Sequence, residues 1–258
     1  MKPLHLLFAF LCTSPFAVGG ILISEDFESY TDGSILGGQN GWQDVTTGSR
    51  RMRVGNGNYL PTRVLDGRGT PDCCGGISFA TKPLSQALNP QSTTVLSFDG
   101  YATSSGIPTT NTGIYFGVAG QILNNLSVGW GANATGFWVF DARGATGNNQ
   151  NSWQTPEAIF TTYDRPGKLE VIVDGLNGLV YGKYDFGGGI SGQTPQFAIT
   201  SQQISQLAAV TIYVDLNTPG RLGGEFDNIL VEDVPEPAGL SIVGLALLLA
   251  VRLRRIQV

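Results

Sequence analysis

Short stretches of strand-forming residues recur along the chain, and clusters of Gly, Asn, Asp, Pro and Ser separate them. Leu169, Val171 and Val173 are spaced two positions apart, and this period of two places side chains on one face of a strand. Comparable stretches lie at 93–102, 112–120, 136–142, 168–175, 179–186, 210–216 and 225–232. We expect about ten to twelve strands, one short helix at 201–208 and no alternation of strands with long helices. This pattern predicts an all-β fold in which two antiparallel sheets pack as a sandwich.

Two glycine-containing segments are interpreted as turns. Asp174–Gly175 and Asn177–Gly178 lie between two predicted strands, and these residue pairs tolerate the positive φ that a hairpin turn requires. The segment 187–192 fits the spacing G-x-G-x-x-G, but Pro195 and a further strand follow it where a dinucleotide site needs a helix. We therefore expect a turn there and no nucleotide site.

An apolar segment and a basic cluster follow the strand-rich region. Residues 238–251 carry no charge, and a helix of this length measures about 21 Å against a hydrocarbon core of about 30 Å. Arg252, Arg254 and Arg255 are able to snorkel to a membrane surface and place the tail on its cytoplasmic side. The segment is therefore predicted to be a transmembrane helix, and a terminal amphipathic or core helix is the alternative.

The first twenty residues have the layout of a secretory signal peptide. Lys2 precedes an apolar stretch at 4–12, and the small residues Ala17, Gly19 and Gly20 follow it. The alternative is a first buried strand or helix. With both ends set aside, we expect a signal peptide at 1–20, one β-sandwich domain at 21–233 and a sorting segment at 234–258.

The last segment resembles a known sorting signal. Pro235, Glu236 and Pro237 precede the apolar helix and the arginine cluster, and this order is similar to the PEP-CTERM signal of exported bacterial proteins. The resemblance implies that an exosortase, a membrane protease, recognises these three residues and removes the tail. It also implies a Gram-negative bacterium that makes extracellular polysaccharide, and a mature protein at the cell surface or in the extracellular matrix.

Composition excludes several classes of function for the exported part. Without the two ends it carries eleven basic and nineteen acidic residues, a net charge of −8, which disfavours a nucleic-acid partner. The single histidine, His5, lies in the signal peptide, so the exported part lacks imidazole for a catalytic triad or a zinc site. Cys73 and Cys74 are adjacent, with Cα atoms about 3.8 Å apart, too close for an ordinary disulfide. We interpret them as loop thiols, with a strained vicinal bridge or an intermolecular bond as alternatives.

A second resemblance concerns the two edges of the domain. The segments 24–42, SEDFESYTDGSILGGQNGW, and 223–233, GGEFDNILVED, are similar to the first and last strands of concanavalin A-like and laminin-G-like jelly rolls. This resemblance implies that the terminal strands pair within one sheet. It also implies a jelly-roll sandwich of the kind shared by lectins, carbohydrate-binding modules and some glycosidases, and fold alone does not choose among those roles.

Carboxylates near the two edges are candidates for a metal site. If the terminal strands pair, Asp26 or Glu28 comes near Asp227, and hard oxygen ligands of this kind suit a structural Ca²⁺. Solvated carboxylates at a strand end are the alternative. A polysaccharide hydrolase or lyase would instead use a carboxylate pair such as Glu28 and Asp227 for acid–base chemistry.

Two tryptophans lie in polar loops, where an exposed ring is able to stack on a sugar. Trp153 lies in GNNQNSWQTP and Trp42 in GGQNGWQD, whereas Trp138 lies within a predicted strand and is expected in the core. We therefore predict an exported, non-catalytic surface or matrix protein that contacts extracellular polysaccharide. The alternatives are a polysaccharide hydrolase or lyase, and a purely structural or adhesive protein.

Overall fold

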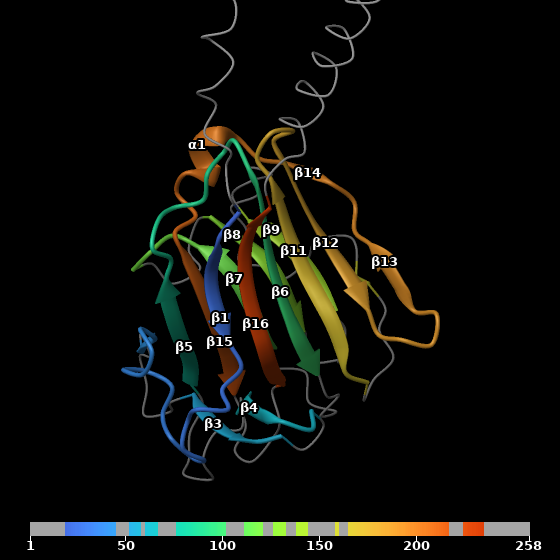
Figure 1. Cartoon of the computed structure of the whole chain (residues 1–258). Coiled ribbons are helices and arrows are strands. Elements are labelled where there is room, and N and C mark those ends of the chain that lie inside the picture. Colours follow the sequence, from blue (N-terminus) through green and yellow to red (C-terminus); the bar gives the residue numbers. More distant parts are fainter. Residues whose placement is uncertain are drawn as a thin grey trace, which may run out of the picture.

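The computed structural model describes residues 19–44, 52–57, 60–66, 76–101, 111–120, 126–132, 138–143, 158–159, 165–216 and 224–234. These residues form two β-sheets, and every strand pairing within each sheet is antiparallel. Figure 1 shows the sheets as two layers, with β3 and β4 at one end of the molecule and α1 at the other. The predicted all-β sandwich of antiparallel sheets is confirmed.

The larger sheet has nine strands among the described residues. Its order is β13 (Ser191–Gln193), β12 (Leu179–Asp185), β11 (Gly167–Asp174), β6 (Thr93–Tyr101), β16 (Glu225–Val234), β4 (Arg63–Asp66) and β3 (Arg53–Asn56), with β1 (Ile21–Glu25) paired to β16 and β14 (Phe197–Ala198) paired to β12. The seven-stranded sheet has the order β10 (Ala158–Ile159), β9 (Trp138–Arg143), β8 (Ser127–Ala132), β7 (Asn111–Gly117), β15 (Ala209–Leu216), β5 (Gly76–Pro83) and β2 (Gln43–Asp44).

All seven stretches predicted from residue alternation are strands in the structure: they are β6, β7, β9, β11, β12, β15 and β16. The expected total of ten to twelve strands is too low, because the described residues contain sixteen. Several of the additional strands, such as β2 and β10, have only two residues, which is too short to show an alternating pattern.

The two predicted turns are also present. β11 and β12 pair from Lys168 and Asp185 to Asp174 and Leu179, and Gly178 in the connecting turn has a φ of 64°. Gly187, Gly188 and Gly189 all have positive φ and connect β12 to β13, so the glycine-rich segment is a turn between strands.

The predicted helix is shorter than expected. α1 spans Ser201–Ile204, and Thr200 and Gln203 form a capping box at its N-terminus. Among the described residues, no helix is long and apolar enough to cross a membrane, and the predicted membrane segment 238–251 lies outside them. Residues 1–18 of the predicted signal peptide also lie outside the described residues.

The core lies between the two sheets and is rich in aromatic rings. Trp138 of β9 contacts Phe98 of β6 and Phe226 of β16, with ring centroids 6.0 and 6.3 Å apart. Trp130 of β8 donates from Nε1 to the carbonyl oxygen of Glu170 in β11 at 2.7 Å. Trp138 is therefore a core residue, as predicted, and each of these two indoles joins one sheet to the other.

The first and last described strands pair as the resemblance implies. β1 and β16 pair from Ile21 and Glu232 to Glu25 and Ile229, and β16 also pairs with β6 and β4. The register of β16 shifts after Asp227, where Asn228 has a φ of 51°. This pairing places the residues after Glu25 close to the beginning of β16.

Candidate functional site

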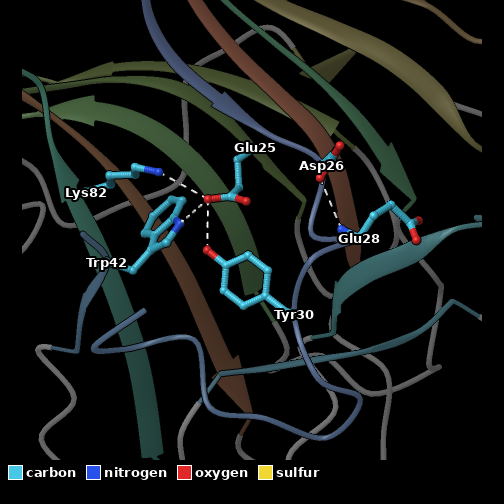
Figure 2. A network of polar contacts seen from close by, with 6 residues as sticks. All are labelled: Glu25, Asp26, Glu28, Tyr30, Trp42 and Lys82. Carbon is cyan, nitrogen blue, oxygen red and sulfur yellow. Dashed lines mark hydrogen bonds and ion pairs between the residues drawn. The ribbon is translucent and has the colours of Figure 1, made fainter. Parts of the chain in front are cut away.

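A buried carboxylate at the end of β1 holds three elements together. Glu25 is 6% exposed, and its Oε2 accepts hydrogen bonds from Tyr30 Oη at 2.9 Å, Trp42 Nε1 at 3.1 Å and Lys82 Nζ at 3.1 Å. Figure 2 shows the three donors converging on this oxygen, while Asp26 and Glu28 lie apart from them. Burial, followed by the hydrogen bond to Glu25 and the charge of that carboxylate, raises the pKa of Tyr30. We call Glu25, Tyr30, Trp42 and Lys82 the Glu25 cluster.

The structure contradicts the prediction that Trp42 is an exposed sugar platform. Trp42 is only 1% exposed, and Lys82 Nζ lies 5.6 Å from the centroid of its ring. Gly38, Asn40 and Gly41 have positive φ, and they turn the loop so that the indole points inward to Glu25. The polar neighbours of Trp42 in the sequence therefore mark a tight loop, and the ring itself belongs to the Glu25 cluster.

Three carboxylates from the first and last described segments of the domain accept hydrogen bonds from one short segment, residues 60–63. Glu225 Oε2 accepts the backbone N–H of Leu60 at 2.9 Å, and Glu28 Oε1 accepts that of Arg63 at 2.9 Å. Thr62 donates from its hydroxyl to Asp227 Oδ2. The acidic residues in the two terminal segments thus position the beginning of β4, a role that the sequence did not reveal because their partners lie 35 to 165 residues away.

Asp227 is the most deeply buried of the predicted calcium ligands. It is 1% exposed, and its Oδ1 accepts the backbone N–H of Asn228 at 2.7 Å while Oδ2 accepts Thr62. Burial raises the pKa of Asp227, the bonds from Thr62 and Asn228 oppose this rise, and the charges of Asp99 and Glu28 add to it. Asp227 and Glu28 accept hydrogen bonds from the adjacent residues Thr62 and Arg63, so the structure brings these two carboxylates to one short segment.

The three predicted calcium ligands do not gather around one point. Asp26 is exposed, and its Oδ1 accepts the backbone N–H of Glu28 at 3.1 Å. Within the described residues, no group of three or more His, Cys, Asp or Glu side chains is arranged to hold a metal ion. As Asp26, Glu28 and Asp227 lie here, they do not fit a Ca²⁺ ion, and calcium binding stays a prediction without support from the geometry.

A hollow opens beside Glu28, where β3 ends and β4 begins. Its volume is about 240 Å³, and its lining residues are Glu28, Asn56, Gly57, Pro61, Thr62 and Arg63. Arg63 Nη1 donates to the carbonyl oxygens of Glu28 and Tyr30, and its buried Nε has no hydrogen-bond partner among the described residues. The hollow therefore combines a carboxylate, a hydroxyl, an amide and a guanidinium, a donor and acceptor set that suits a polar ligand.

The second face of the seven-stranded sheet carries a different group of side chains. The register places Thr81, Thr211 and Tyr115 side by side, opposite the face that packs in the core. A Cβ at Gly129 would lie 2.6 Å from Tyr115 Cδ1, and one at Gly113 would lie 2.5 Å from its Cε2, so the ring lies along the sheet over both glycines. Thr81, Tyr115 and Thr211 are each at most 2% exposed, so this group of side chains is buried and is not available to a ligand as it lies here.

Several predicted site residues lie outside the described residues. They are Trp153, the sorting motif Pro235, Glu236 and Pro237, the arginines Arg252, Arg254 and Arg255, and the adjacent thiols Cys73 and Cys74. Their predicted roles stay predictions.

Several solved structures to which this chain is similar are lectins. Peanut lectin with a nine-residue peptide aligns with a TM-score of 0.55 and 11% identity, covering 84% of this chain and 98% of the lectin. Lectin II from Ulex europaeus aligns at 0.52 and 6% identity, covering 83% of this chain and 100% of the lectin. A Bauhinia forficata lectin in complex with GalNAc aligns at 0.51 and 9% identity, covering 80% and 97%. These similarities show a lectin-like jelly-roll sandwich. No family model and no curated protein matches the chain.

Proposed function

We propose that this protein is a non-catalytic, carbohydrate-contacting protein of the cell surface or extracellular matrix. The observation that carries the proposal is the fold, because a two-sheet sandwich covering most of the chain aligns with lectins over nearly their full length. One of those lectins is in complex with GalNAc. The polar hollow beside Glu28 supports the same function, because a sugar needs hydrogen-bonding side chains in a concave site.

The environment of Asp227 favours binding over hydrolysis. A glycosidase needs two carboxyl groups that reach the scissile bond from either side. Asp227 is buried, and both of its carboxylate oxygens already accept hydrogen bonds from Thr62 and Asn228. Glu28 and Asp227 are therefore poorly placed as an acid–base pair, and a hydrolase or lyase is the second candidate function.

Retention on polysaccharide tests the proposed function. We expect the purified protein to be retained on at least one immobilised polysaccharide from a panel of glucans, galactans and alginates, without release of reducing ends. Bovine serum albumin on the same resins gives the background. Reducing-end release that disappears in Glu28→Gln would establish the enzyme instead, and no retention on any resin would favour a purely structural or adhesive protein.

We also propose that the protein is exported and that an exosortase removes its tail at Pro235–Pro237, as the sequence resemblance implies. In cells that possess the protease, mass spectrometry of the mature protein should find a C-terminus within or next to these residues. Replacing Glu236 by alanine should leave the tail attached. A wild-type protein that retains Val258 in such cells would contradict the sorting proposal.

A further inference from the structure

We infer that the hollow lined by Glu28, Asn56, Gly57, Pro61, Thr62 and Arg63 binds one neutral sugar residue and that it does so without a metal ion. This inference rests on the proposed function and specifies its site and ligand class. It follows from the unused hydrogen-bonding groups of the hollow, from the surrounding charge and from the size of the space.

Two lining side chains have hydrogen-bonding atoms that are not engaged within the described part of the chain. Glu28 accepts the Arg63 N–H through Oε1, and its Oε2 accepts no hydrogen bond there. Arg63 uses Nη1 for two carbonyl oxygens, and its Nη2 donates to none of the described residues. A carboxylate oxygen only accepts and a guanidinium N–H only donates, whereas a hydroxyl group does both. A ligand with neighbouring hydroxyl groups is therefore able to satisfy both residues together.

The surrounding charge disfavours an acidic sugar. Glu28 and Asp99 both lie close enough to Asp227 for their negative charges to raise its pKa. Asp32 lies on the other side of Asn56, which donates from Nδ2 to Asp32 Oδ2 at 3.4 Å. A uronate carboxylate in the hollow would meet these negative charges, and among the described residues that line the hollow Arg63 is the one cation, so a neutral sugar is favoured.

The volume of the hollow limits the size of the ligand, and the arrangement of the nearby carboxylates decides whether a metal ion takes part. Sites for drug-sized ligands measure about 300–1,000 Å³, so a hollow of about 240 Å³ fits a smaller ligand, such as one residue of a polysaccharide. Across the described ranges no set of carboxylates is arranged for a metal ion, so the sugar would bind to the side chains directly. The carboxylates Glu225 and Asp227 serve the site indirectly, because they hold the residues 60–63 that form its wall.

Isothermal titration with soluble oligosaccharides tests this inference. The probes are oligomers of a neutral β-glucan, a neutral galactan and alginate, each titrated into the full protein with and without EDTA. We expect a neutral oligomer to bind, alginate not to bind, and EDTA and added salt to leave the affinity unchanged. Glu28→Gln should weaken neutral-sugar binding about tenfold, because a hydrogen bond to a charged acceptor is roughly twice as strong as one to a neutral acceptor.

A second hollow variant and a control variant distinguish a loss of binding at the hollow from a loss of the folded structure. Pro61 is exposed at the edge of the hollow, so Pro61→Tyr should narrow the space and also weaken binding. Glu170→Gln on β11 removes a carboxylate that pairs with Lys168 at 4.0 Å and does not line the hollow, so its affinity should match the wild type. Far-ultraviolet circular dichroism should be the same for all four proteins.

The outcomes separate this inference from the function on which it rests. Neutral-sugar binding that both hollow variants leave unchanged would place the site elsewhere, while the proposed function would stand. Loss of binding in EDTA would contradict a metal-free site. Alginate binding that Glu28→Gln strengthens would identify an anion site instead. If no oligomer binds to the wild type, the proposed function itself fails.

Discussion

Replacing Glu25 by alanine should lower the free energy of unfolding by about 3 kcal/mol. The substitution leaves Tyr30, Trp42 and Lys82 without their shared acceptor. Breaking a buried ion pair costs roughly 3–5 kcal/mol, and we expect the lower end because the Lys82 side chain is 17% exposed and is able to reach water. Urea denaturation, followed by tryptophan fluorescence, measures the change as a lower midpoint.

Ser24→Ala is the matched control for Glu25, because it is the preceding residue of β1 and its side chain is exposed. We expect its unfolding free energy to lie within about 0.5 kcal/mol of the wild type. If Glu25→Ala were no more destabilising than Ser24→Ala, the Glu25 cluster would not stabilise the fold, and the interpretation of Trp42 as a structural residue would lose its main support.

Gly129→Ala should destabilise the protein by about 2–3 kcal/mol. Gly129 lies on β8, and a Cβ there would meet the carbonyl oxygen of Ile114 at 2.2 Å and the Cα of Tyr115 at 2.6 Å. These atoms belong to the backbone of β7, so a side-chain rotation does not relieve the overlap, and the two strands must move apart. Thermal and urea unfolding of the variant measure the loss.

Gly117→Ala provides the comparison on the same face of the same sheet. The nearest atom to a Cβ at Gly117 is Thr211 Oγ1 at 3.7 Å, an ordinary contact. Alanine also reduces the conformational freedom of the unfolded chain, so we expect this variant to be neutral or stabilised by up to about 1 kcal/mol. Equal stability of the two variants would mean that β7 and β8 are spaced more loosely than described.

The strands were predictable from the sequence where they are long and have one face in the core. β11 shows this most clearly, since Leu169, Val171 and Val173 are all buried and the alternation is visible without any other information. Strands with two or three residues give no such periodicity, and pairing with a longer neighbour determines them. β14, for example, is a strand because Phe197 and Ala198 pair with Val180 and Leu179.

The candidate site was only partly predictable, because side-chain partners distant in the sequence determine it. Asp227 and Glu28 were expected near each other, since the resemblance to jelly rolls implies that the terminal strands pair, as β1 and β16 do. Their attachment to residues 60–63 has no local signal, because the segment is held across as many as 165 residues of chain. Trp42 was misassigned for the same reason, since its partner Glu25 lies seventeen residues earlier and outside the loop that suggested exposure.

The pairing of β1 with β16 also decides how the domain is presented to its surroundings. The backbone N–H of Asp233 donates to the carbonyl oxygen of Gly20 at 2.9 Å, so the chain enters and leaves the sandwich at the same corner. Asp227 lies seven residues before Val234 along β16, which at about 3.3 Å per residue is roughly 20 Å away, and the hollow beside Glu28 lies at that distant end. A polypeptide that continues from either end of the domain would attach it at this corner. The end of the sandwich that carries the hollow would then face away from the attachment point.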